Sequence, residues 1–342
     1  MAFVRNLWYV AAWSHDVPAG KPVGVEVLGE PLVLYRRGDG GLTAFDDRCP
    51  HRLAPLSLGR VEGDDLRCMY HGLRFAPDGR CVELPGSAKP PARLAARTFP
   101  VVERWSWIWV WPGDPAKADP ARVPRAFGLE DPDWVYRSGA LDYAADYELL
   151  NDNLCDLSHL DFVHEKSLGW ASGSKWSNDS PRISAEDDGL RIERWFRDHP
   201  IMGSQPQRVD TWSSYRYVLP GLFLLTTQAF PVGTAEASGL GPPDGKPIFH
   251  RIDQQSVTPI GVGRSRYLWA LGFPRAIATP AFLEGAYQVT RKSFDEDKRI
   301  IEAQQRIWER LPPERKPSAI PQDQAPAMFR RLVSQRLADE TS

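Results

Sequence analysis

Two cysteine–histidine pairs in the first quarter of the chain restrict its fold more than any other feature. Cys49-Pro50-His51 is followed, after a spacer of sixteen residues, by Cys68-Met69-Tyr70-His71. The pattern is C-x-H and then C-x-x-H, so each half carries one thiol and one imidazole within two or three residues. Each half can therefore form a loop that clamps a metal.

Three interpretations of this pattern compete. Two cysteines on one iron and two histidines on the other are the ligands of a Rieske [2Fe–2S] cluster, whose imidazoles raise the reduction potential. A structural Cys₂His₂ zinc site uses the same ligand types, but zinc fingers usually keep the cysteines in one half and the histidines in the other. The third interpretation is coincidence, which is improbable with four cysteines and seven histidines in 342 residues. The pattern favours the Rieske cluster.

Short β-rich runs and turn residues surround these loops and predict a small all-β domain. A Gly-rich turn at 38–41 lies between two of the runs, which is a hairpin signature. A stretch rich in proline, alanine and charge at 114–125 is a plausible linker. The runs lie at residues 31–35, 42–45, 73–75, 80–83 and 105–111.

A second set of candidate ligands lies in residues 142–164, which are predicted to be mostly helical. His159 and His164 are five residues apart, and this spacing leaves their side chains roughly 140° apart on an ideal helix. They can share a metal only if the helix bends, bulges or ends between them. The alternative is a pair of surface histidines on an amphipathic helix. A Gly- and Ser-rich stretch at 167–178 is predicted as a loop.

An oxygenase with a mononuclear iron needs one carboxylate beside two imidazoles. A helix predicted from about residue 280 to 310 offers three adjacent acids, Asp295, Glu296 and Asp297. Residue types alone leave the three equal, and a solvated run of charge is the alternative. Strand-like segments at 190–195, 217–225 and 266–271 separate the two helical regions.

The cluster loops resemble those of the Rieske non-haem iron oxygenases, and segments 5–11 and 99–104 resemble the vanillate and dicamba O-demethylase branch. The resemblance implies an α+β chain. An N-terminal all-β Rieske domain would span residues 1–115. A C-terminal catalytic domain of helix-grip or START-like type, an antiparallel sheet flanked by helices, would span residues 116–342.

The resemblance also implies the roles of the candidate residues. Cys49 and Cys68 would bind one iron of the cluster, and His51 and His71 the outer, exposed iron. The mononuclear iron would be held by His159, His164 and Asp297.

Two further residues match family positions in residues 151–164. Asp156 matches the acid that links a cluster histidine of one subunit, here His71, to an iron-bound histidine of the next. A cyclic homotrimer follows from that link, while a helix-surface acid is the alternative. Asn153 matches a polar residue near the iron.

The implied function is the oxygenase component of a multicomponent monooxygenase that hydroxylates or O-demethylates a small aromatic substrate with O₂. A vanillate-like methoxybenzoate is the expected substrate, and hydroxylation of another aromatic or fused-ring compound is the alternative. A plain Rieske electron-transfer protein is an alternative of a different class, but it would leave most of the chain unexplained.

The substrate pocket of the family matches residues 222–230 and 254–258 and the helix around Tyr287. Gln255 and Gln288 stand where the dicamba enzyme has histidine and tryptophan, which disfavours dicamba as the substrate.

Electrons must come from a separate reductase or ferredoxin, with NAD(P)H used indirectly. Gly239-Leu240-Gly241 runs into two prolines, which does not suit a helix that begins at a nucleotide phosphate. The formal net charge of −2 argues against nucleic acid as a partner. We expect a cytoplasmic protein without a membrane span, because we find neither a long apolar run nor a signal peptide.

Overall fold

Strands dominate both parts of the chain. The computed structural model describes residues 3–165, 167, 180–200, 207–312, 314–315 and 317–341. The chain divides into two units, one of residues 1–130 and 258–262 and the other of residues 131–257 and 263–341. The loop predicted at 167–178 lies outside the described residues, apart from Ser167.

The first unit contains three small antiparallel sheets, as predicted for an all-β domain. Their strand orders are β1-β11-β10, β2-β3-β4-β9 and β5-β6-β7-β8. The strands are β1 Tyr9–Trp13, β2 Val23–Val27, β3 Glu30–Arg36, β4 Leu42–Asp46, β5 Arg60–Glu62, β6 Asp65–Arg67, β7 Arg74–Phe75, β8 Cys81–Glu83, β9 Thr98–Phe99, β10 Val101–Arg104 and β11 Trp107–Val110.

Strand β3 separates two hydrophobic cores in this unit. Leu32 and Leu34 belong to one core, whereas Val33 and Tyr35 belong to the other. The alternation follows from the two-residue period of a strand. The second core also contains Cys49 and Cys68, so the motif loops are anchored by their cysteines in a packed interior.

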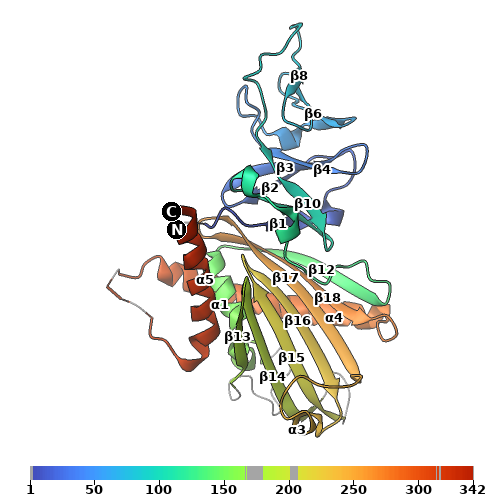
Figure 1. Cartoon of the computed structure of the whole chain (residues 1–342), viewed down its shortest axis with the longest axis vertical. Helices are drawn as coiled ribbons and strands as arrows, with labels where there is room; N and C mark the ends of the chain where they lie inside the picture. The colour runs from blue at the N-terminus through green and yellow to red at the C-terminus, as the bar shows by residue number, and fades with distance from the viewer. Residues whose placement is uncertain are drawn as a thin grey trace. The chain divides into compact units, whose positions relative to one another are not determined.

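The second unit is built on one seven-stranded antiparallel sheet of order β12-β18-β17-β16-β15-β14-β13, drawn in Figure 1 from green to orange. Its strands are β12 Trp134–Tyr143, β13 Arg182–Glu186, β14 Gly189–Pro200, β15 Arg208–Val218, β16 Leu222–Phe230, β17 Phe249–Gly261 and β18 Arg264–Pro274. The helices are α1 Tyr147–Cys155, α2 Leu160–Val163, α3 Thr234–Ala237, α4 Pro280–Trp308 and α5 Gln324–Thr341.

The prediction of a single strand-like segment at 217–225 is wrong in one respect. The chain turns at Leu219-Pro220, so β15 ends at Val218 and β16 begins at Leu222. Pro220 has no N–H group to donate to a sheet ladder, which is why a turn replaces a continuous strand.

The long helix predicted near residues 280–310 is confirmed as α4. Thr279 caps its N-terminus by accepting a hydrogen bond from the Phe282 N–H, and Pro280 occupies its first turn. Asp297 lies on the buried face of the helix. The buried residues of α4 recur at helical spacing and are Thr290, Ser293, Asp297, Ile301 and Gln305. Within the described ranges, no helix is both long and apolar enough to cross a membrane.

Candidate metal centres

The first motif loop is closed by backbone hydrogen bonds around Cys49. The Cys49 N–H donates to the Ala54 carbonyl oxygen at 2.9 Å, and the Leu53 N–H donates back to the Cys49 carbonyl at 2.8 Å. Leu53 has a φ of 58°, a left-handed conformation that is uncommon for a residue with a side chain.

The second motif loop repeats this pattern. The Cys68 N–H donates to the Leu73 carbonyl at 2.8 Å, and the Gly72 N–H donates to the Cys68 carbonyl at 3.0 Å. Gly72, four residues after its cysteine as Leu53 is, has a φ of 76°. The two loops therefore share one backbone design.

Thiols and imidazoles face different environments in these loops. Cys49 and Cys68 are 2% and 1% exposed, whereas His51 and His71 are exposed, with ring centroids 4.5 Å apart. Burial raises the pKa of the Cys49 thiol to about 11, and the neighbouring Cys68 adds to this increase. A bound cation is what keeps two such sulfurs deprotonated. The pairs fit a cluster with a buried sulfur-ligated iron and an exposed imidazole-ligated iron.

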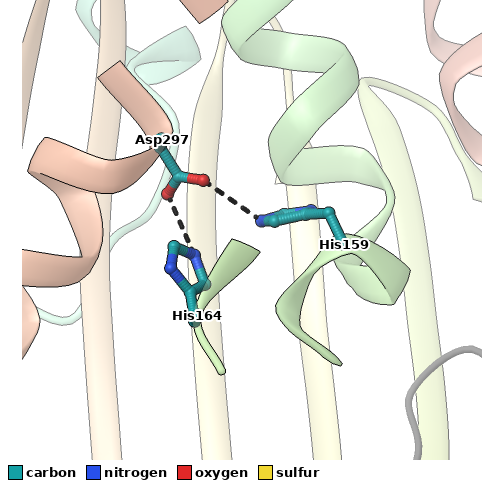
Figure 2. A group of neighbouring side chains, drawn as sticks. All are labelled: His159, His164 and Asp297. Carbon is teal, nitrogen blue, oxygen red and sulfur yellow. Dashed lines mark ion pairs between the residues drawn. The ribbon is translucent and has the colours of Figure 1, made fainter. Parts of the chain in front are cut away.

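A second centre is formed by His159, His164 and Asp297, whose nearest ligand atoms all lie within 4.8 Å of one another. The Asp297 carboxylate points one oxygen at each ring (Figure 2). Its Oδ1 lies 3.5 Å from His159 Nε2, and its Oδ2 lies 3.3 Å from His164 Nε2. The group is two imidazoles and one carboxylate, with no fourth His, Cys, Asp or Glu among the described residues, which matches the donor set of non-haem iron oxygenases.

The two histidines flank the one-turn helix α2 Leu160–Val163, which ends between them, as their spacing requires. Helix α1 ends at Cys155, and the short 3-10 helix η5 Leu157–His159 follows it. His164 comes directly after α2. The ring centroids of the two histidines are 5.5 Å apart.

The three adjacent acids of α4 have three different environments. Asp295 forms an exposed ion pair with Arg291 at 3.3 Å. Asp297 faces both Nε2 atoms. Glu296 Oε2 accepts a hydrogen bond from His164 Nδ1 at 3.0 Å and another from the Ser167 hydroxyl at 2.6 Å.

A hydrogen bond at Nδ1 orients each histidine ring. His159 Nδ1 donates to the backbone carbonyl of Asp156 at 2.8 Å, while His164 Nδ1 donates to the Glu296 carboxylate. Such partners fix the tautomer with Nε2 free to bind metal, and a carboxylate partner makes the imidazole more basic. Sequence reasoning considered Glu296 only as a competing ligand, so this supporting position was missed.

The pKa values of the two imidazoles shift in opposite directions. Burial lowers the pKa of His159, and the charge of Asp297 offsets only part of this change. Burial also acts to lower the pKa of His164, but Asp297 and Glu296 together raise it above its usual value.

Asn153 and Asp156 both lie beside the triad. Asn153 Nδ2 is 3.3 Å from His159 Nε2 and 3.3 Å from Asp297 Oδ1. The Asp156 carboxylate caps η5 by accepting from the Ser158 N–H at 2.9 Å and from the Ser158 hydroxyl at 2.7 Å. The predicted link from Asp156 to a neighbouring subunit stays a prediction.

A cavity of about 440 Å³ adjoins the triad and is lined mainly by apolar side chains. His159, His164 and Asp297 form part of its wall, and Phe residues contribute from β14, β16, β17, β18 and α4. This volume lies within the usual range for small-molecule sites. The polar side chains of the sheet that line it are His199, Thr211, Ser213, Thr227, Arg251, Asp253 and Gln255.

The pocket residues expected from the sequence are only partly correct. Gln255 lines the cavity, and its Oε1 accepts a hydrogen bond from the Tyr267 hydroxyl at 2.5 Å. Gln288 is exposed, donates to Glu284 at 2.7 Å and is not among the lining residues. Sequence matching did not reveal that this position on α4 is exposed.

Comparisons with known proteins agree with both centres. Residues 7–101 match the Rieske [2Fe-2S] domain, and residues 143–339 match the vanillate O-demethylase oxygenase C-terminal domain. The chain is 36% identical over 316 residues to a toluene-4-sulfonate monooxygenase system iron-sulfur subunit of Comamonas testosteroni, covering 91% of this chain and 90% of the relative. It is 32% identical over 354 residues to a vanillate O-demethylase oxygenase subunit of Pseudomonas sp. strain HR199, covering 99% and 96%.

Two crystal structures of dicamba monooxygenase share the fold. The complex with dicamba has a TM-score of 0.87 and 31% identity, covering 100% of this chain and 99% of that one. The structure with non-haem iron and dicamba has a TM-score of 0.79 and 29% identity, with the same coverage. The cofactors predicted from the sequence are confirmed: a Rieske [2Fe–2S] domain and a non-haem iron site at His159, His164 and Asp297.

Proposed function

Because this chain belongs to the Rieske non-haem iron oxygenases, in the vanillate and dicamba O-demethylase branch, we propose that it oxidises a small, ring-containing aromatic substrate of the methoxybenzoate type. The observation that carries the proposal is the apolar cavity of about 440 Å³ whose wall includes the iron triad. A ring bound there lies against the metal ligands and is shielded from water by the phenylalanines.

When bound, the cluster supplies electrons one at a time and the iron activates O₂. The chain's own residues hold these groups and the substrate. Asp156 and Glu296 keep each imidazole in the tautomer that presents Nε2, and the cavity wall holds the ring in place. Oxygen inserted into a methyl C–H bond of an aryl ether gives a hemiacetal, which collapses to a phenol and formaldehyde.

Hydroxylation of a ring or methyl group is the second candidate reaction. Similarity to the subunit of toluene-4-sulfonate monooxygenase favours it, since that enzyme's named substrate has a methyl group and no ether. The remaining alternative, a plain electron carrier, is wrong, because the chain belongs to an oxygenase family and contains the iron triad.

The electron supply and the assembly are part of the proposal. A separate reductase or ferredoxin reduces the cluster, which is bound by Cys49, His51, Cys68 and His71. In a homotrimer, Asp156 connects His71 of one subunit to the iron-bound His159 of the next. The division into domains 1–115 and 116–342 is likewise proposed.

Formaldehyde release tests the reaction. The purified chain, a surrogate reductase, NADH and O₂ are incubated with a panel of methoxybenzoates, and formaldehyde and phenol are quantified. Equal amounts of both products support O-demethylation. Hydroxylated products without formaldehyde support the second candidate. If no aromatic compound is turned over in an NADH-dependent way, the proposal is contradicted. Metal analysis should give about three irons and two acid-labile sulfides per chain.

A further inference from the structure

The cavity wall contains a band of polar side chains that the iron chemistry does not use. In the register of the sheet, Thr227 on β16 faces Arg251 on β17, and Ser213 on β15 faces Thr227. All three residues line the cavity. Cross-strand neighbours have Cβ atoms about 5 Å apart, so two hydroxyls and a guanidinium form one band across an otherwise apolar wall.

Arg251 is the single lysine or arginine among the described residues that line the cavity. Its Nη2 donates to Asp253 Oδ1 at 2.5 Å, and the two side chains are 22% and 2% exposed. An arginine buried without a counter-charge is costly, so Asp253 allows the guanidinium to remain in the wall when no ligand is bound.

The donors of this band are not saturated by the protein. Within the part of the chain that the structure describes, the Arg251 Nε, the Ser213 hydroxyl and the Asp253 Oδ2 are buried and have no hydrogen-bond partner. Unpaired buried polar groups are rare in folded proteins and call for a partner. An arginine with an unpartnered Nε beside two hydroxyls is suited to an oxyanion, since hydrogen bonds from a guanidinium to a carboxylate are charge-assisted.

His199, the other candidate for an anion-binding group in the wall, is already engaged. Its Nδ1 lies 3.0 Å from the Pro200 carbonyl, and its Nε2 lies 2.8 Å from the Thr211 hydroxyl. Burial lowers the pKa of His199 and so disfavours its protonated form. The positive charge of the wall therefore comes from Arg251.

The position of Arg251 also fits a ring that reaches the iron. Arg251, Asp253 and Gln255 lie on the same face of β17, and Arg251 is roughly 13 Å along the strand from Gln255. The ion pair with Asp253 draws the guanidinium back toward the Gln255 end. Arg251 and the iron triad line the same cavity of about 440 Å³.

We propose that Arg251, held by Asp253 and flanked by Thr227 and Ser213, anchors a carboxylate or sulfonate on the aromatic substrate and so directs the opposite end of the ring to the iron. This inference rests on the proposed function and adds the residues that hold the charged group of the substrate and set its orientation. It assigns specificity to residues that the sequence did not single out.

Binding without turnover tests the anchor separately from the reaction. Isothermal titration of the holoenzyme, without reductase, compares 4-methoxybenzoate with 4-methoxybenzamide, and 4-methoxybenzenesulfonate with its sulfonamide. Wild type should bind each acid more tightly than its amide. The acid that shows the larger preference identifies which oxyanion the site fits better.

Arg251→Gln should reduce the acid-to-amide affinity ratio by about 10- to 100-fold, the range for a charge-assisted hydrogen bond. Asp253→Asn should keep the preference, because the guanidinium remains. Arg182→Gln is the matched control, since Arg182 on β13 is exposed, forms an ion pair with Glu193 on β14 and does not line the cavity. It should leave the ratio unchanged.

Arg251→Gln leaves a buried carboxylate without its cation and could fail to fold. The double variant with Arg251→Gln and Asp253→Asn removes both charges, and it should also lose the preference. An unchanged ratio in either folded arginine variant, or wild-type protein that binds no acid more tightly than its amide, overturns the proposal. A preserved preference in an enzyme that releases no formaldehyde would instead count against O-demethylation.

Discussion

The cluster loops and the iron triad differ in how far apart their parts are in the chain. Each loop is closed by hydrogen bonds between residues at most five positions apart, as from the Cys49 N–H to the Ala54 carbonyl. In the triad, the two hydrogen bonds that orient the histidines differ in span. The bond from His159 to Asp156 joins residues three positions apart, whereas the bond from His164 to Glu296 joins residues 132 positions apart. The first site is thus a property of local backbone geometry, and the second is a property of tertiary packing.

The two sites also differ in exposure. The cluster histidines are exposed, whereas the His159 and Asp297 side chains are 19% and 8% exposed and His164 only 3%. An exposed imidazole pair suits the exchange of electrons with another protein. A buried triad beside an apolar cavity suits chemistry from which water is excluded.

The largest effect is expected from His159→Ala. Removing one ligand should abolish turnover and reduce bound iron to the two atoms of the cluster, because the two sites share no residue. The visible absorption of the cluster should stay intact. Simultaneous loss of that absorption would contradict the independence of the two sites.

Glu296→Gln should weaken the iron site without removing a ligand. We expect iron affinity, measured by competition with a chelator, to fall by about 10- to 100-fold, because a neutral amide supports the His164 ring less well. The matched control is Asp295→Asn, which changes the neighbouring acid that pairs with Arg291 on the surface. Equal losses in both variants would indicate a general effect of charge on α4.

Gly72→Ala should disturb the cluster loops alone. A Cβ at Gly72, with its φ of +76°, would lie 2.9 Å from Pro85 Cγ, and a side chain in left-handed conformation costs about 1–2 kcal/mol. Thermal bleaching of the cluster should occur at lower temperature, with iron binding at the triad unchanged. Leu53→Gly, at the matching position of the first loop, should not lower the bleaching temperature, since it relieves a φ of 58°.

The smallest effect concerns the response of each unit to pH. In the first unit, Arg67 lowers the pKa of Glu83. The ionised form of this acid therefore stabilises the fold at pH values above the ordinary pKa of a glutamate. In the second unit, burial raises the pKa of Asp152 on α1 from 3.8 to about 6. An acid with a raised pKa favours folding while it is protonated, and that contribution is lost as pH rises from about 4 to 6.

Asp152→Asn should therefore remove a pH dependence. Across that window the wild type should lose about 1–2 kcal/mol of unfolding free energy relative to the variant; the amount is modest because the carboxyl is 28% exposed and faces Arg330. Urea unfolding at several pH values measures it. Parallel curves for both proteins between pH 4 and 6 would show that Asp152 does not retain its proton.

Much of the candidate site could be predicted because its signals are short. The C-x-H and C-x-x-H spacing indicated the cluster. The five-residue spacing of His159 and His164 required the helix to change between them, and α2 ends at Val163, just before His164. The β-hairpins and α4 also follow from local patterns of apolar and turn residues. These features depend on neighbours in the chain, so the amino-acid order specifies them.

Only the tertiary structure decided the rest. Asp295, Glu296 and Asp297 are indistinguishable as residue types, and their roles follow from which way each points as α4 packs in the second unit. Arg251, Ser213 and Thr227 become one band only when β15, β16 and β17 pair in register. The physical reason is that a helix or strand fixes the spacing of its side chains along one axis. The direction in which a side chain points within the fold, and the residues that it contacts, depend on distant segments that pack against that element.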